Sequence, residues 1–212
     1  MPRAVYLFLF ILVWMQSCGE VQREPLPYLG GKVPVYDSSG QVIDSTWHRI
    51  PHFSLLDQDS QRFTRQMLDG KVFVACFFFT SCPSICPRMI RQMQRLRHMT
   101  DTQRVVLLSI TIDPKRDTPK RLRKYIASND LHTPNWYFLT GSRDSIYPLG
   151  MEGFKLAMAE NSASPGGFVH SEHFVLCDGE GHIRGFYKGT DAAEVTRLAH
   201  DIKWLLEEEQ AL

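Results

Sequence analysis

Two continuous apolar runs in the middle of the chain predict buried strands. Residues 72–79 and 105–112 are apolar and β-favouring almost without interruption, which is typical of strands covered on both faces. Between the two runs, Met89, Met93 and Leu96 recur at helical spacing. The alternation of strand, helix and strand predicts a right-handed unit with two parallel strands in one sheet.

The flanking segments extend this alternation in both directions. Before the first buried strand, residues 53–55 and 61–64 predict two short strands joined by a polar turn. The later elements are expected, in order, as a helix at 119–129 capped by Asp117 or Thr118, a short strand at 136–139, a helical turn at 142–149, an antiparallel hairpin of strands 168–177 and 182–187, and an amphipathic helix at 192–208. This order predicts an α/β protein with a thioredoxin-like fold, in which helices flank a central mixed sheet and strands extend the N-terminus.

The start of the chain has the pattern of an export signal. The apolar run at 4–14 is too short to span a bilayer but has the length of a signal-peptide core. Ser17 before Cys18 resembles the lipoprotein processing box, although the two residues before Ser17 are not the preferred ones. We therefore expect residues 1–18 to be a lipoprotein-type signal peptide with Cys18 as the lipidated residue; ordinary export with an irrelevant Cys18 is the alternative.

Export places the mature protein in an oxidising compartment of the cell envelope, facing the periplasm or another extracytoplasmic side and held to the membrane by the lipid. Residues 19–46 are rich in Pro, Gly and Ser and predict a tether with one short extended piece at 32–36. Residues 47–212 are long enough for one compact domain. With a formal net charge of +1, the chain offers no electrostatic support for nucleic-acid binding.

Candidate chemistry lies directly after the first buried strand, where Cys82 and Cys86 are separated by three residues. Two intervening residues would indicate a thioredoxin-type dithiol, whereas the longer loop also suits a soft metal ion between two sulfurs. The spacing alone fits two small hydrophobic side chains as well. Pro87 suits the first helical position, so we expect Cys86 to cap the helix, where backbone N–H groups lower the pKa of a thiol.

A nitrogen donor would complete a metal site, and His170 is the best candidate among eight histidines. It follows a glycine-rich loop at the entry to the predicted hairpin, which faces the cysteine turn in a thioredoxin-like layout. His173, three residues further along an extended strand, is expected to point to the opposite face. An ordinary surface or hydrogen-bonded histidine is the alternative for His170.

Two further features leave alternatives open. Cys76 and Cys177 lie inside predicted strands and are most simply buried free thiols, unless the two strands place them close enough to form a second disulfide. Basic side chains dominate the helix after the cysteines and the stretch 115–124. A solvated basic face is the default interpretation, and docking of an acidic partner is the alternative.

Three separated segments together resemble the SCO/SenC family in order and spacing. They are residues 78–87, residues 109–119, and His170-Ser171 before a strand that ends in Asp178-Gly179. The resemblance covers about residue 50 to the C-terminus. It implies a thioredoxin-fold factor that binds copper, as Cu(I) or Cu(II), through Cys82, Cys86 and His170 and helps to assemble the binuclear copper centre of cytochrome c oxidase. The implied partner is the copper-bearing subunit of the oxidase or another copper or thiol protein of the envelope.

The chain departs from the family pattern at two positions. Val169 stands where many relatives have Asp, and Ser81 stands where relatives often have His.

The function expected first is that of a metallochaperone. It either delivers copper or prepares the thiols of the oxidase copper site. The main alternative is a thiol-disulfide reductase without metal, in which Cys82 attacks and Cys86 completes a redox-active dithiol. A peroxide-reducing relative is disfavoured, because paired thiols and a histidine exceed what a lone peroxidatic cysteine requires.

Overall fold

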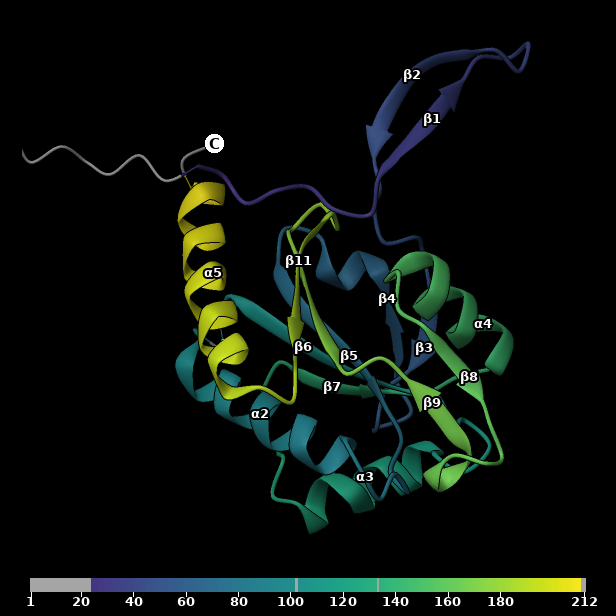
Figure 1. Ribbon diagram of the computed structural model, residues 1–212, viewed down its shortest axis with the longest axis vertical. Helices are drawn as coiled ribbons and strands as arrows, with labels where there is room; N and C mark the ends of the chain where they lie inside the picture. Colours follow the sequence, from purple (N-terminus) through teal and green to yellow (C-terminus); the bar gives the residue numbers. More distant parts are fainter. Residues whose placement is uncertain (1–23, 102, 133, 211–212) are drawn as a thin grey trace, which may run out of the picture.

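The computed structural model describes residues 24–101, 103–132 and 134–210, and a five-stranded mixed sheet forms its centre (Figure 1). The strand order is β11-β10-β5-β6-β7. The five strands are β5 (Val72–Phe78), β6 (Val105–Thr111), β7 (Trp136–Leu139), β10 (His173–Cys177) and β11 (Ile183–Lys188). The strands β5, β6 and β7 run parallel, and β10 pairs antiparallel with both β5 and β11. The predicted thioredoxin-like α/β fold is confirmed.

The two apolar runs became the two innermost parallel strands. Every residue of β5 and β6 is buried, which explains why neither strand alternates polar and apolar positions. Helices cover the faces of the sheet: α2 (Cys86–Met99), α3 (Pro119–Ser128), α4 (Arg143–Pro148) and α5 (Ala192–Gln210). Met89 and Met93 are fully buried on the inner side of α2, so they serve the core.

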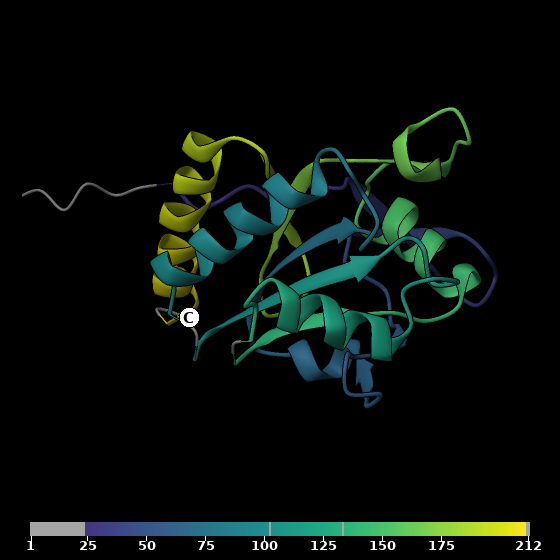
Figure 2. The same cartoon turned by 90° about the horizontal axis from the view of Figure 1, so that it is seen from below.

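The helices α2 and α3 lie next to each other on one side of the sheet. Both connect parallel strands in the same direction across the sheet, and right-handed crossovers of this kind place their helices on the same face. The side-chain amide of Gln94 in α2 donates to the carbonyl of Asp130 just after α3, at 3.3 Å. Seen from below, α2 and α3 are neighbours, with α5 beside α2 (Figure 2).

Short elements surround this framework. They are the hairpin strands β3 (Ser54–Leu56) and β4 (Arg62–Thr64), the paired strands β8 (Met158–Glu160) and β9 (Phe168–His170), and the helical turns η2 (Arg65–Leu68), η3 (Leu149–Gly153) and η4 (Pro165–Gly167). The predicted short strands before β5 are thus confirmed as β3 and β4. None of the helices in the described part of the chain combines the length and apolar character needed to cross a membrane.

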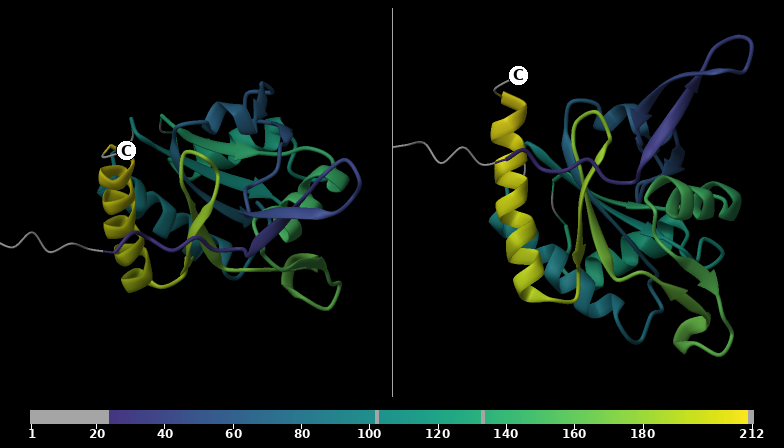
Figure 3. Two further views of the ribbon diagram at one scale, coloured as in Figure 1. Left: turned by 90° about the horizontal axis from the view of Figure 1, so that it is seen from above. Right: turned by 45° about the horizontal axis from the view of Figure 1, so that its top comes forward.

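An exposed hairpin occupies part of the stretch predicted as a tether. The strands β1 (Lys32–Tyr36) and β2 (Val42–Trp47) pair antiparallel and project from the domain (Figures 1 and 3). The extended piece at 32–36 was expected, whereas its partner strand was not. Asp37 closes the turn, since its carboxylate accepts from the backbone N–H groups of Ser39 and Gln41. The predicted signal peptide at 1–18, with Cys18, lies outside the described residues.

The predicted strand at 168–177 is wrong as one element, because the chain changes sheets within it. β9 pairs with β8, and β10 begins only at His173 in the central sheet. Between them, the N–H of Ser171 donates to the carbonyl of Ala157, and the carbonyl of Glu172 accepts from Gly189. This break turns His170 toward the cysteine loop while the residues of β10 enter the core.

Candidate metal centre

The cysteine loop leaves the carboxyl end of β5 and leads directly into α2. The backbone N–H of Cys82 donates to the carbonyl of Phe79 at 3.2 Å, which folds the loop back toward the strand. The N-cap of α2 is Ile85, whose carbonyl accepts from Met89 at 3.0 Å. The expectation that Cys86 caps the helix is therefore wrong by one residue: Cys86 is the first helical residue, with Pro87 behind it.

A buried carboxylate holds the entrance of the loop in place. Asp117 accepts from the backbone N–H and the hydroxyl of Thr80, at 2.9 and 2.5 Å, and from the hydroxyl of Thr111 at 2.6 Å. The helix cap expected from Asp117 or Thr118 is supplied by Thr118, which accepts from the N–H of Arg121. Asp117 thus links the ends of β5 and β6, a role that only its place in the second family-like segment could have suggested.

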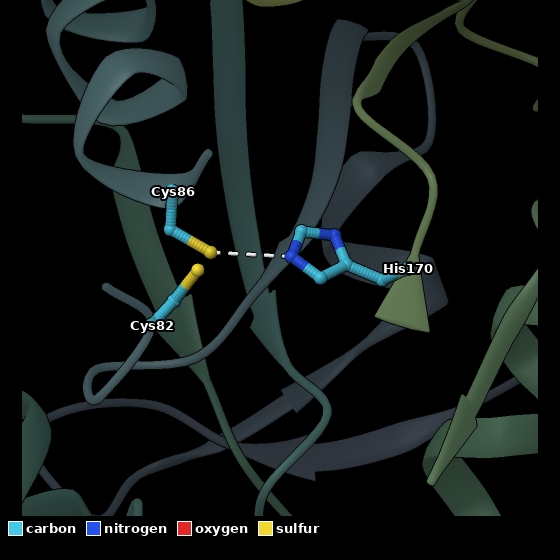
Figure 4. Close-up of side chains that lie close together, drawn as sticks. All are labelled: Cys82, Cys86 and His170. Atoms are coloured by element: carbon cyan, nitrogen blue, oxygen red, sulfur yellow. Dashed lines mark hydrogen bonds between the residues drawn. The ribbon is translucent and has the colours of Figure 1, made fainter. Parts of the chain in front are cut away.

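The imidazole of His170 faces the two sulfurs (Figure 4). Its Nε2 lies 3.2 Å from the Sγ of Cys86, and its Nδ1 lies 2.9 Å from the carbonyl of Ser171. A carbonyl can only accept, so Nδ1 carries the proton and Nε2 keeps its lone pair for the site. One ligand atom from each of Cys82, Cys86 and His170 lies within 4.8 Å of the others, so the three residues could hold a metal ion.

An aromatic wall and a glycine shape the side of the site. The ring of Phe79 packs edge-on against the imidazole of His170, with centroids 5.8 Å apart, and also contacts Phe168. Gly166 has φ of 82°, and a Cβ at this position would come within 2.7 Å of the Phe79 ring. The glycine-rich loop noticed in the sequence therefore allows the backbone to approach Phe79 closely.

The two histidines near the site differ as expected. His170 is 9% exposed and lies in the group of donors, whereas His173 is exposed and contacts the hydroxyl of Ser171 at 2.9 Å. Val169, the residue that departs from the family pattern, is 49% exposed. Adjacent strand residues point to opposite faces, so Val169 points away from the imidazole, whose orienting partner is the carbonyl of Ser171.

The two thiols have very different affinities for a proton. A hydrogen bond from the Cys86 thiol is the main cause that lowers the pKa of Cys82 to about 3, and the backbone N–H groups of Cys86 and Ser84 act in the same direction, against the effect of burial. The same hydrogen bond and burial raise the pKa of Cys86 above its usual range. The pair therefore carries one thiolate near neutral pH, on the more exposed sulfur, since Cys82 is 8% exposed and Cys86 1%.

The remaining cysteines of the described region do not join this site. Cys76 and Cys177 are buried free thiols, as expected, and the possible second disulfide is absent among the described residues. Although β5 and β10 are neighbours, Cys177 pairs with Phe73, three positions from Cys76 along the strand. Burial raises the pKa of Cys76 to about 12 and that of Cys177 well above its usual value.

The chain belongs to the SCO1/SenC family, whose model matches residues 44–207. A SCO1/SenC family lipoprotein from Bacillus anthracis is 30% identical, with a TM-score of 0.69 over 75% of this chain and 95% of that protein. BsSco, described with a disulfide switch as a member of the Sco family of cytochrome c oxidase assembly proteins, is 30% identical, with a TM-score of 0.65 over 74% and 92%. The copper-bound ScoI of Bradyrhizobium japonicum is 26% identical, with a TM-score of 0.62 over 73% and 98%.

Proposed function

We propose that the chain binds copper through Cys82, Cys86 and His170 and takes part in assembling the copper site of cytochrome c oxidase. The convergence of two sulfurs and one unprotonated imidazole nitrogen within 4.8 Å carries the proposal. Two thiolates and an imidazole form a soft set of low coordination number, which suits Cu(I) and tolerates Cu(II). The copper bound to the Bradyrhizobium japonicum relative supports the choice of metal.

Delivery proceeds in this proposal by ligand exchange, with thiols of the recipient replacing Cys82 first. Cys82 is the more exposed sulfur and lies in the loop, whereas Cys86 is fixed in the first turn of α2. The Ser171 carbonyl holds the His170 ring at one angle throughout. The recipient is the copper-bearing subunit of the oxidase or another copper or thiol protein of the envelope.

Anaerobic titration of the reduced protein with Cu(I), against a chromophoric chelator, tests the binding. We expect one equivalent of copper, and His170→Ala should weaken binding by about 10-fold or more. His173→Ala is the matched control and should bind like the unmodified chain. Absorption and spin-resonance spectra of the Cu(II) form should report sulfur and nitrogen ligation. Protein that takes up no stoichiometric copper, or equal affinity in the two histidine variants, contradicts the proposal.

A thiol-disulfide reductase is the second candidate, favoured by the lowered pKa of Cys82 beside a second thiol. The thiolate of Cys82 would attack a partner disulfide, and Cys86 would release the partner as a thiol, leaving a Cys82–Cys86 disulfide. The disulfide switch of BsSco supports this candidate. If reduction is the main role, turnover on a mixed disulfide should survive His170→Ala and be abolished by Cys82→Ser.

Export and anchoring complete the proposal. The lipoprotein named among the similar structures supports a signal peptide at 1–18 and a lipid on Cys18. In cells, labelled palmitate should enter the full chain and the protein should sediment with membranes, whereas Cys18→Ala should abolish both the label and the sedimentation. A Cys18→Ala protein that is exported and still membrane-bound would contradict the lipid anchor.

A further inference from the structure

Two helices beside the cysteine loop form an almost purely basic surface, which we call the basic face. It consists of the exposed sides of α2 and α3 and the turn that precedes α3. The basic side chains of these segments are Arg88, Arg91, Arg95, Arg97, Lys115, Arg116, Lys120, Arg121, Arg123 and Lys124. Neither helix contains an acidic residue, although the whole chain has nearly as many acids as bases. These segments thus carry ten basic side chains against two aspartates, Asp113 and Asp117.

The carboxylates near the basic face neutralise only a small part of its positive charge. The two aspartates of the turn, Asp113 and Asp117, are 4% and 0% exposed and therefore offer no negative surface. Arg116 and Arg121 pair with them, at 3.2 and 3.9 Å. Six further basic side chains of this face have no carboxylate within 4.0 Å among the described residues. They are Arg88, Arg91, Lys115, Lys120, Arg123 and Lys124.

A hollow in the basic face lies close to the candidate metal centre. A cavity of about 250 Å³ is lined by Arg121, Lys124 and Asn129 on the side of α3 and by Thr80 on the side of the loop. Thr80 precedes Cys82 by only two residues, and Arg88 follows Cys86 by two. A carboxylate entering this hollow would meet two cations and an amide while its backbone lies over the cysteine loop.

The position of the face favours a protein partner over a lipid surface. Half of the large exposed apolar side chains lie on the N-terminal hairpin, including Tyr36, Val42 and Ile43, whereas Met99 at the end of α2 is the exposed apolar side chain of the basic face. That hairpin projects from the end of the molecule opposite to α3 (Figure 1). Membrane-binding surfaces combine basic with apolar side chains, whereas the hollow is lined by charged and polar side chains together with the ring of Tyr125.

We propose that the basic face docks an acidic surface of the protein that exchanges thiols or metal with Cys82 and Cys86, with one carboxylate seated between Arg121 and Lys124. The inference rests on the proposed function, since it identifies the charge of the recipient. Positive charge beside the exchanging sulfur raises the rate at which an acidic partner meets Cys82 productively. It lowers the corresponding rate for basic proteins.

Synthetic peptides provide the test on the reduced protein. Each peptide carries one cysteine as a mixed disulfide with thionitrobenzoate, flanked by glutamates, serines or lysines. The Cys82 thiolate attacks the peptide sulfur, the old disulfide breaks, a Cys82–peptide disulfide forms, and thionitrobenzoate leaves with the electron pair and is measured by its absorbance. At low salt the glutamate peptide should react at least about 10-fold faster than the serine peptide and the lysine peptide more slowly, with both differences lost at high salt.

Charge reversal locates the effect. In the double variant Arg88→Glu with Lys124→Glu, the ratio of the glutamate to the serine rate should fall to about one or below. The control is Lys71→Glu with Lys203→Glu, two exposed lysines at the start of β5 and on α5, and it should keep the ratio of the unmodified chain. Using the ratio removes any change in the reactivity of Cys82 itself.

The possible failures are distinguishable. Failure of the Cu(I) titration would contradict the proposed copper binding, and a lack of exchange with every peptide would contradict the reductase candidate. Exchange without a preference for glutamate would overturn the docking inference alone. Sedimentation with phosphatidylglycerol vesicles tests whether the basic face binds lipid headgroups instead of a protein. If Arg88→Glu with Lys124→Glu abolishes vesicle binding and leaves the peptide ratios unchanged, the face binds lipid headgroups and the proposal is wrong.

Discussion

The two pairs of cysteines in the described chain have the same side chain but opposite chemistry. Cys82 and Cys86 lie where β5 ends and α2 begins, within reach of each other and of His170. Cys76 and Cys177 lie within neighbouring strands and do not meet. Burial shifts the pKa of all four thiols upward, but only Cys82 has donors that reverse the shift, so its pKa falls to about 3 while that of Cys76 rises to about 12.

The difference shows that the end of a strand, rather than the presence of a thiol, makes the site. Inside a sheet, the backbone N–H groups are already used by the neighbouring strands, so a buried sulfur finds no backbone donor. Cys76 contacts only the hydroxyl of Ser109, at 3.5 Å, and burial outweighs that contact. At the carboxyl end of β5, the loop and the first turn of α2 leave N–H groups of Ser84 and Cys86 free to stabilise an anion. Alkylation, metal affinity and stability should separate the two pairs.

The largest difference between the two pairs should be seen in the rate at which iodoacetamide alkylates each cysteine of the native, reduced protein. Because the pKa of Cys82 is lowered, its thiolate persists as pH falls, and its rate should change less than twofold between pH 8 and pH 5. An ordinary thiol loses about a factor of ten per pH unit below its pKa. Cys76 and Cys177, both 0% exposed, should remain unmodified until the protein unfolds.

Peptide mass spectrometry after a timed quench measures each cysteine separately. The same reaction in denaturant is the control, in which all the thiols should react and follow the ordinary pH dependence. A Cys82 rate that falls tenfold per unit in the native protein would show that the hydrogen bond from Cys86 does not hold the thiolate, and native labelling of Cys76 would remove the contrast between the pairs.

Metal affinity should separate the pairs next. Cys86→Ser removes one of the three proposed donors, so the Cu(I) affinity should fall by more than about 100-fold, beyond the usual cost of losing an outer partner. Cys76→Ser changes a side chain on the same strand that leads to the loop but contributes no donor, and its Cu(I) affinity should match that of the unmodified chain. Competition with a chromophoric Cu(I) chelator measures both. Equal losses in the two variants would mean that the cysteines act through folding alone.

Much of this arrangement is present in the sequence. The apolar runs predicted β5 and β6 to within a residue at their ends, and the spacing of Cys82, Cys86 and the glycine loop before His170 indicated the donors. These features are local, since each depends on burial or on turn chemistry within a few residues. The thioredoxin-like layout then required the loop and the histidine to face each other.

The parts that the sequence did not predict depend on distant partners. The pattern at 168–177 alternates too little to show that β9 pairs with β8 while β10 enters the central sheet. β2 was missed because all its residues are exposed, so burial imposes no pattern on it. Asp117 was expected at most as a cap, because its contacts with Thr80 and Thr111 bring together three separate segments.

For stability, the order of the two pairs should be reversed: substitution of a buried strand cysteine should lower the free energy of unfolding more than substitution of a cysteine in the loop. Cys177→Ser places a hydroxyl at a fully buried strand position, and an unsatisfied buried polar group costs about 1–3 kcal/mol in the free energy of unfolding. Cys82→Ser should cost less, because the hydroxyl can accept from the N–H groups of Ser84 and Cys86 that now face the sulfur. Urea unfolding of the reduced proteins measures both, with Cys177→Ala as the control for lost volume. A larger loss for Cys82→Ser would contradict the comparison.

The smallest effect is expected from placing an aspartate beside His170, the proposed nitrogen ligand. Val169→Asp should change the Cu(I) affinity by less than about threefold, well below the 10- to 100-fold effects of true outer partners. The reason is geometric: Val169 is half exposed on the opposite face of β9, and Nδ1 of His170 already donates to the carbonyl of Ser171. The same titration with Val169→Asn separates the new charge from the change in shape. A gain above tenfold with Asp alone would mean that an aspartate here reaches the imidazole, so that the strand must rotate when the metal binds.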